Sequence, residues 1–199
     1  MKTSVAKALF NSHSYSEYRK LLADLLLECK STGNQQSEDL TLYSTLNETR
    51  MNRLDKTMKI TDENILKIKS LKGEYIWLVI SEGWCGDAAQ ILPVINKITE
   101  ESDKIDLKIV LRDENEDLMN LFLTNKARAI PIVIVIDKLT GDVLRNWGPR
   151  PKAAADLIKN YVKGFGAIDE TAKTDLQLWY LHDKGLSTQE ELINLMENL

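Results

Sequence analysis

The chain has 199 residues, a length that favours one domain with embellishments over two small domains. Its hydrophobic fraction of 43% and charged fraction of 28% are ordinary for a soluble globular protein. The formal net charge is −4 and acidic and basic residues are interspersed, so the sequence contains no basic stripe that would neutralise phosphates. Nucleic acid is therefore not an expected partner.

The N-terminus carries a short apolar patch around Val5 and Phe10, and Lys7 interrupts it. The sequence shows no long hydrophobic region with a clear cleavage site, and no segment of transmembrane length. With two cysteines and no secretion signal, the chain is expected in the reducing cytoplasm, without a membrane partner or a disulfide framework.

Residues 1–72 are expected to form a helical N-terminal extension. Ser14 or Ser16 is a candidate cap for its first helix, whose apolar residues recur at three- and four-residue spacing: Tyr15, Tyr18, Leu22, Leu25 and Cys29. Because Cys29 lies on this stripe, we interpret it as a buried packing residue. The polar stretch 31–37 is the best loop candidate in this half of the chain.

A second helix is expected next, and one face of it carries Leu40, Tyr43, Asn47, Met51, Leu54 and Met58. Asn47 interrupts this apolar face and Arg50 flanks it. We interpret both as solvated residues at the border of the stripe. Alternatively, if the helix lies over the end of the sheet that carries Cys85, Arg50 or Arg53 supplies positive charge there. Thr61 then caps a short third helix.

From residue 73 the pattern alternates between strands and helices, which predicts a sheet with parallel strands covered on both faces. Strands are expected at 75–80, 105–111, 132–136 and 143–147, and helices at 85–101, 116–124 and 152–162. Pro93 should kink the first of these helices. The continuous β-branched run at 132–136 is typical of a central strand that is buried on both sides.

Cys85 stands in the turn between the first of these strands and the helix that follows it. A cysteine at the first turn of a helix faces unpaired backbone N–H groups and the positive end of the helix dipole, and both favour the reactive thiolate. The alternative is a small apolar residue that happens to lie at a helix start. Asp87 places a carboxylate beside the thiol, so we expect the pKa of Cys85 to be lowered only modestly.

These features together resemble the thioredoxin family. Trp84-Cys85-Gly86 is similar to the first three residues of its Trp-Cys-Gly-Pro-Cys site, and Pro93 stands where the family has its helix-kinking proline. Residues 128–132 resemble the segment that brings the family's cis-proline against the catalytic cysteine, and Gly148 falls at the glycine of its last hairpin. The resemblance implies an α/β, thioredoxin-like fold over residues 73–165, with a mixed central sheet flanked by helices.

The resemblance assigns Cys85 as the catalytic residue. The residues expected to bind substrate or shape the site are Trp84, Gly86, Asp87, Ile130, Pro131 and Gly148. Pro131, after a cis peptide bond, would shape a groove in which a substrate backbone docks. Arg112 and Asp113 are candidate supporting residues, because the carboxyl ends of parallel strands meet at one edge of a sheet. The resemblance also suggests a hydrogen bond from the Trp84 indole to Asp113, whereas Asn115 is expected to cap the next helix.

Two positions depart from the family's pattern. Ala88 stands where the resolving cysteine would be, and Val79 replaces the buried acid that assists proton transfer in the dithiol enzymes. The second step of a dithiol cycle, in which a resolving cysteine attacks the mixed disulfide, is therefore missing. The sequence contains no Gly-rich phosphate loop and no cysteines at zinc-binding spacing, so neither a cofactor nor a metal is expected.

Residues 166–199 are expected to form a C-terminal extension of two helices, the second with Ser187 and Glu190 in a capping box. The many apolar side chains of this extension either pack back on the domain or bury a face in the second subunit of a homodimer. We interpret His182 as structural or exposed, because no cysteine or carboxylate spacing makes it a metal or catalytic residue.

Two functions are compatible with these residues. In the first, the Cys85 thiolate attacks a disulfide or is oxidised, and an external thiol resolves the mixed disulfide or sulfenic acid; the partner is a protein disulfide or a low-molecular-weight thiol. In the second, the fold is a non-catalytic module that binds a protein partner. Trp84-Cys85-Gly86 and Ile130-Pro131 favour the monothiol oxidoreductase, and the residues at Ala88 and Val79 favour the module.

Overall fold

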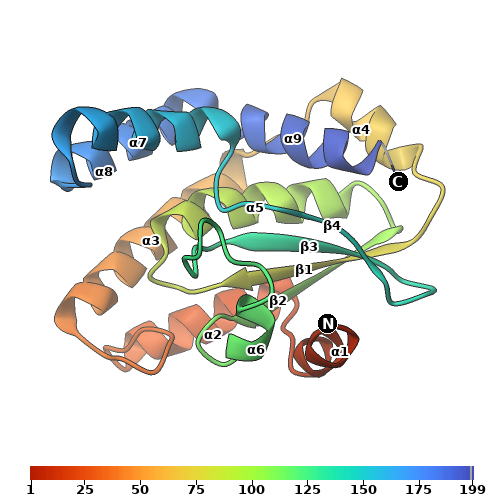
Figure 1. Ribbon diagram of the computed structural model, residues 1–199, viewed down its shortest axis with the longest axis horizontal. Coiled ribbons are helices and arrows are strands. Elements are labelled where there is room, and N and C mark those ends of the chain that lie inside the picture. The colour runs from red at the N-terminus through yellow and green to blue at the C-terminus, as the bar shows by residue number, and fades with distance from the viewer. Residues whose placement is uncertain (198) are drawn as a thin grey trace.

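The computed structural model describes residues 1–197 and 199, which contain a four-stranded mixed sheet with the strand order β2-β1-β3-β4 (Figure 1). The strands are β1 (Tyr75–Ser81), β2 (Ile105–Leu111), β3 (Ile132–Asp137) and β4 (Val143–Trp147). β1 runs parallel to β2 and antiparallel to β3, and β3 pairs antiparallel with β4. The sheet therefore combines the predicted parallel pair with the predicted closing hairpin.

The middle of the sheet is apolar on both faces. Residues 77–80 of β1 are fully buried, and residues 132–136 of β3 are at most 1% exposed. Both strands have neighbours on either side in the sheet and helices above and below. This confirms the prediction that 132–136 forms a central strand.

Helices cover the two faces of the sheet (Figure 1). α5 (Gly86–Glu100) connects β1 to β2 on one side, and α3 (Glu38–Thr57) packs beside it. α1 (Lys2–Phe10), α2 (Tyr15–Leu27) and the single turn of α6 (Glu116–Met119) lie on the opposite side. α3 therefore lies next to α5 at the edge of the molecule where β1 ends.

The remaining helices form an outer layer beyond α5 (Figure 1). They are α4 (Asp62–Lys69), α7 (Lys152–Phe165), α8 (Glu170–Asp183) and α9 (Leu186–Met196). α9 packs against α4 and α5, α7 packs against α8, and the apolar side chains on the inner face of α9 are fully or almost fully buried. The C-terminal helices therefore pack back on the domain, one of the two arrangements expected for them.

Two predicted helix starts are confirmed by their hydrogen bonds. Ser14 caps α2: its hydroxyl accepts a hydrogen bond from the Glu17 N–H, and the Glu17 carboxylate accepts one from the Ser14 N–H. Thr61 caps α4 by accepting a hydrogen bond from the Asn64 N–H.

The prediction that Cys29 is buried is wrong. α2 ends in a Schellman motif: the Cys29 N–H donates to the Leu26 carbonyl, and the Lys30 N–H donates to the Leu25 carbonyl. Cys29 takes the left-handed conformation that this motif requires, with φ 56°. The chain therefore leaves the helix before the apolar stripe reaches Cys29, and its side chain is exposed.

Other helix ends also differ from the predictions: α7 ends at Phe165 instead of residue 162. α6 ends at Met119 instead of residue 124, and the chain then bridges Thr124 with Ala127 in a turn. α9 begins after Gly185, whose φ of +76° starts the helix sharply. Ser187 lies inside α9 and bonds to Asp183, so it does not head a capping box.

Within the described residues, no helix combines the length and the hydrophobicity that crossing a membrane requires.

Candidate functional site around Cys85

Cys85 lies at the junction of β1 and α5. It is the N-cap residue of α5, and its Sγ accepts a hydrogen bond from the Ala88 N–H at 3.5 Å. The thiol in turn lies 3.3 Å from the Ile130 carbonyl oxygen, to which it donates. The strand-helix turn and the segment before β3 therefore meet at the sulfur.

The Ile130–Pro131 peptide bond next to this contact is cis, and so is the Gly148–Pro149 bond. Gly148 has a φ of +125°, and a Cβ at this position would collide with the carbonyl oxygen of Pro131. Only a glycine allows the chain after β4 to pass so close to Pro131. The structure thus brings Ile130, Pro131 and Gly148 together beside Cys85.

Asp87 joins the site to two more elements. One oxygen of its carboxylate lies 2.7 Å from Nη2 of Arg150, and the other accepts a hydrogen bond of 2.9 Å from the hydroxyl of Tyr180. Arg150 belongs to the segment after β4 and Tyr180 to α8. Asp87 and Tyr180 are buried, and Arg150 is half-buried, so the three form a polar cluster with little access to water.

Sequence reasoning missed both partners of Asp87. Arg150 stands between two prolines in the run from Trp147 to Pro151, and this rigid context was the one signal that marked it. Tyr180 carried no comparable signal, because its position on an amphipathic helix is typical of ordinary packing.

The environment of Cys85 keeps its thiol protonated. Burial, and after it the negative charge of Asp87, raise the pKa of Cys85 to about 12. The backbone N–H groups of Ala88 and Asp87 and the charge of Arg150 act in the opposite direction but do not outweigh them. The expectation of a modestly lowered pKa is therefore wrong, because Cys85 is only 8% exposed.

Trp84 and the Arg112-Asp113 pair form a neighbouring cluster. The Arg112 guanidinium lies 4.7 Å from the centre of the Trp84 ring, and its Nε donates to the Asp113 carboxylate at 2.8 Å. In the described part of the chain the Trp84 indole makes no hydrogen bond to Asp113, so that expectation is wrong. Arg112 and Asp113 support Trp84 and do not contact the thiol.

Asn115 occupies the N-cap position of α6, but its side chain donates to the Leu111 carbonyl and does not cap the helix.

Glu82 is a buried acid that sequence reasoning did not single out. It is 1% exposed, and one carboxylate oxygen accepts a hydrogen bond from the Asp113 N–H. Its other oxygen has no partner among the described residues. Burial raises the pKa of Glu82. Its carboxyl group therefore holds the Asp113 backbone against the turn that carries Trp84.

Asn47 and Arg50 reach the Cys85 turn from α3. Asn47 is fully buried, and its side-chain amide donates to the Gly83 carbonyl at 2.9 Å. Arg50 donates from Nη1 to the Asn47 amide oxygen at 2.7 Å, and Nη1 would lie 3.7 Å from a Cβ placed on Gly86. The interpretation of Asn47 as a solvated border residue is wrong, because α3 lies over the end of the sheet that carries Cys85.

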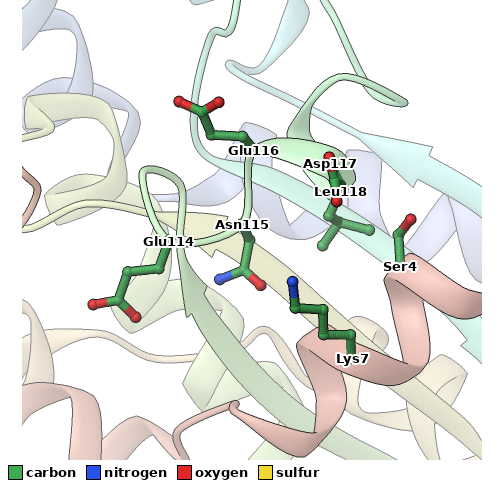
Figure 2. A pocket seen from close by; sticks show the side chains of 7 residues that line it. All are labelled: Ser4, Lys7, Glu114, Asn115, Glu116, Asp117 and Leu118. Atoms are coloured by element: carbon green, nitrogen blue, oxygen red, sulfur yellow. The ribbon is translucent and has the colours of Figure 1, made fainter.

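A pocket elsewhere on the molecule lies between α1 and the loop that leads into α6 (Figure 2). Ser4 and Lys7 line it from α1, and Lys7 extends toward Asn115 on the opposite wall. The pocket is about 160 Å³, and its lining includes none of the residues described around Cys85.

Among the described residues, no group of His, Cys, Asp and Glu side chains is arranged to hold a metal ion. His182 is exposed.

The fold and the site together define a thioredoxin-like protein, and comparison with known proteins agrees. The chain belongs to the thioredoxin family, because the family model described as Thioredoxin matches residues 33–163. This match begins at Gly33, so it includes α3 and α4 as well as the sheet. No curated protein matches the chain.

Two solved structures are similar over nearly their whole length. A protein of unknown function from Pseudomonas aeruginosa has a TM-score of 0.61 at 17% identity, over 94% of this chain and 98% of that one. An HIV epitope-scaffold has a TM-score of 0.58 at 18% identity, over 94% of this chain and 99% of that one. At these identities the similarity shows a common fold.

Proposed function

We propose that this protein performs single-thiol redox chemistry through Cys85. The observation that carries the proposal is the position of the sulfur, which lies between the Ala88 N–H and the Ile130 carbonyl with Pro131 alongside. An incoming disulfide that reaches this position meets a sulfur at a helix start, next to the segment that carries the cis Ile130–Pro131 bond.

The chemistry has two steps. The thiol of Cys85 loses its proton to solvent, and the thiolate attacks one sulfur of a disulfide R–S–S–R′, so that a Cys85–S–S–R bond forms, the S–S bond breaks and R′S⁻ leaves. A second thiolate R″S⁻ from outside then attacks the mixed disulfide, releases R–S–S–R″ and returns Cys85 to the thiolate. Ala88 offers no thiol for this step, so the resolving group comes from a protein or a low-molecular-weight thiol.

The resting site is closed. The raised pKa and the burial of Cys85 both oppose attack, and Tyr180 holds α8 over the site through Asp87. A second contact from α8 is the hydrogen bond between the side chains of Gln90 and Gln177. In this proposal α8 moves away when the substrate docks, and the exposed sulfur then ionises more readily.

A buried ion pair beside the thiol supports this function. Replacing a buried ion pair by apolar groups is often neutral or stabilising. The free energy of folding therefore does not explain why Asp87 and Arg150 are charged. Charged groups that perturb a neighbouring ionisable side chain are common at functional sites. The pair therefore fits a site in which Arg150 stabilises the Cys85 thiolate once it forms.

The second candidate is a non-catalytic module that binds a protein partner. The burial and the raised pKa of Cys85 favour it, together with the absence of a resolving cysteine at Ala88. In this candidate Cys85 is a packing residue at the start of α5.

Oxidation of the purified protein separates the two candidates. The Cys29→Ser variant, which retains Cys85 as its one thiol, is incubated with a small disulfide, and intact mass with peptide mapping follows the products. A redox protein forms a mixed disulfide at Cys85 in the native state, which excess thiol reverses. Loss of the product in the Cys29→Ser, Cys85→Ser double variant is the control. If Cys85 forms no adduct in the native protein and reacts only after denaturation, the protein is the non-catalytic module.

A further inference from the structure

Arg50 is a half-buried cation next to the reactive turn. It projects from α3, and its Nη1 lies against Gly86, the residue that follows Cys85. The Asn47 amide fixes it there, because Asn47 donates to the Gly83 carbonyl and accepts from Arg50. The guanidinium is thus held through Asn47 to Gly83 on one side of the Cys85 turn, and it lies close to Gly86 on the other side.

The other half-buried arginines of the chain are neutralised and Arg50 is not. Arg19 pairs with Glu48 and Asp55, Arg112 with Asp113, and Arg150 with Asp87. Within the described residues Arg50 has no carboxylate partner, and its one hydrogen bond goes to the neutral amide of Asn47.

The surrounding charges leave this site positive. Both oxygens of Asp87 are occupied by Arg150 and Tyr180. Lys173 of α8 is paired with Glu170. Arg53 lies one turn along α3, and burial followed by the charge of Arg53 lowers the pKa of Arg50. Arg50 therefore presents uncompensated positive charge beside Gly86, and Arg53 adds to the positive charge of the same stretch of α3.

We infer that Arg50 selects thiols and disulfides that carry a carboxylate, by pairing with that carboxylate while the sulfur reacts at Cys85. This inference rests on the proposed single-thiol chemistry. A planar guanidinium binds a carboxylate through two parallel hydrogen bonds, and Arg50 has one nitrogen engaged with Asn47 and the remainder of its donors available for a ligand.

The test compares two aromatic disulfides in the Cys29→Ser background. Dithiobis(nitrobenzoate) carries carboxylates and releases a yellow thiolate when Cys85 attacks it, whereas dithiodipyridine is neutral and releases a thiopyridone that absorbs in the near ultraviolet. The Arg50→Gln variant should react about three- to ten-fold more slowly with the carboxylate reagent and within about two-fold of the parent with the neutral one. Arg50→Lys should restore most of the rate with the carboxylate reagent. Arg145→Gln, which removes an exposed arginine from β4, is the matched control and should change neither rate.

Salt dependence gives an answer even if Arg50→Gln does not fold. In the parent protein, raising the salt from about 20 mM to about 500 mM should slow the carboxylate reagent several-fold and leave the neutral reagent unchanged. The inference is overturned if Arg50→Gln slows both reagents equally and the rates of the parent protein do not respond to salt. In that case Arg50 is a structural support for Asn47. Failure of both reagents to modify native Cys85 overturns the proposed chemistry and this inference with it.

Discussion

The two cysteines of this protein lie at opposite helix ends and in opposite surroundings. Cys85 caps the N-terminus of α5 and is 8% exposed, with its sulfur held by Ala88 and Ile130. Cys29 follows the C-terminus of α2 and is exposed. The sequence-based prediction that Cys29 is buried was wrong, because it followed the apolar stripe of α2 past the residue where the helix ends.

A helix end alone therefore does not set the chemistry of a thiol. A helix dipole is worth about 0.3–1 kcal/mol to a nearby charge at an exposed site. Full burial shifts a pKa by up to about 3–5 units, and each unit corresponds to about 1.4 kcal/mol. At Cys85 burial and the Asp87 carboxylate therefore outweigh the helix start.

The fold should strongly protect Cys85 from alkylation. In the Cys29→Ser variant at pH 8, iodoacetamide should modify Cys85 roughly a thousand-fold more slowly in the native protein than in the denatured protein, because a pKa near 12 leaves very little thiolate. Mass spectrometry of timed samples gives both rates. In the matched Cys85→Ser variant, exposed Cys29 should show at most a ten-fold difference. Similar protection of both cysteines would remove the contrast between the two helix ends.

The next effect isolates the charge of Asp87. Asp87→Asn keeps the shape of the side chain and removes the negative charge, so the pKa of Cys85 should fall and its alkylation at pH 8 should become about ten-fold faster. The pH at which the alkylation rate is half-maximal is the measurement.

Tyr180→Phe is the control for this change. It removes the hydrogen bond to Asp87 but leaves the negative charge of Asp87 in place. Loosening of α8 then raises the alkylation rate, while the pH at which this rate is half-maximal changes little. A shift of that pH equal to the one in Asp87→Asn would contradict the assignment to charge.

A third prediction concerns stability in alkali. Because folding raises the pKa of Cys85 to about 12, the folded protein holds this proton more tightly than the unfolded chain does. The resulting stabilisation is complete below the unfolded pKa of about 8.5 and is lost as the pH rises toward the folded value. Between pH 8 and 10, the free energy of unfolding should fall by about 2 kcal/mol more in the parent than in Cys85→Ser. Urea titrations at several pH values measure it, and parallel curves for the two proteins would show that Cys85 ionises normally.

The sheet was predictable because its strands are short apolar runs between clear turns. The predicted bounds of β2 and β4 coincide with the observed ones, and those of β1 and β3 differ by one residue at one end. The helices at both ends of the chain were also predictable as elements, since a stripe at three- and four-residue spacing needs no tertiary information.

The site was only partly predictable. Some site residues were found because they are close to Cys85 in the sequence or match the thioredoxin pattern: Trp84, Cys85, Asp87 and Pro131. Tyr180 contacts Asp87 and Arg50 lies near Gly86 because of the way α8 and α3 pack, and nothing in the sequence gives the position of those helices over the sheet. Local periodicity predicts which face of a helix is buried but not which strand end it covers.

The left-handed conformation of Cys29 at the end of α2 should have a small effect on stability. Cys29 adopts a φ of 56°, which costs an L-residue about 1 kcal/mol and costs glycine much less. Its side chain is exposed, so little packing is lost when it is removed. Cys29→Gly should therefore raise the free energy of unfolding by about 0.5–1 kcal/mol, whereas Cys29→Ser, which keeps a Cβ, should stay within about 0.5 kcal/mol of the parent. Urea unfolding under reducing conditions at neutral pH measures both. A loss of stability of about 1 kcal/mol or more in both variants would mean that Cys29 is packed in the core after all, and the contrast between the two cysteines would then rest on Cys85 alone.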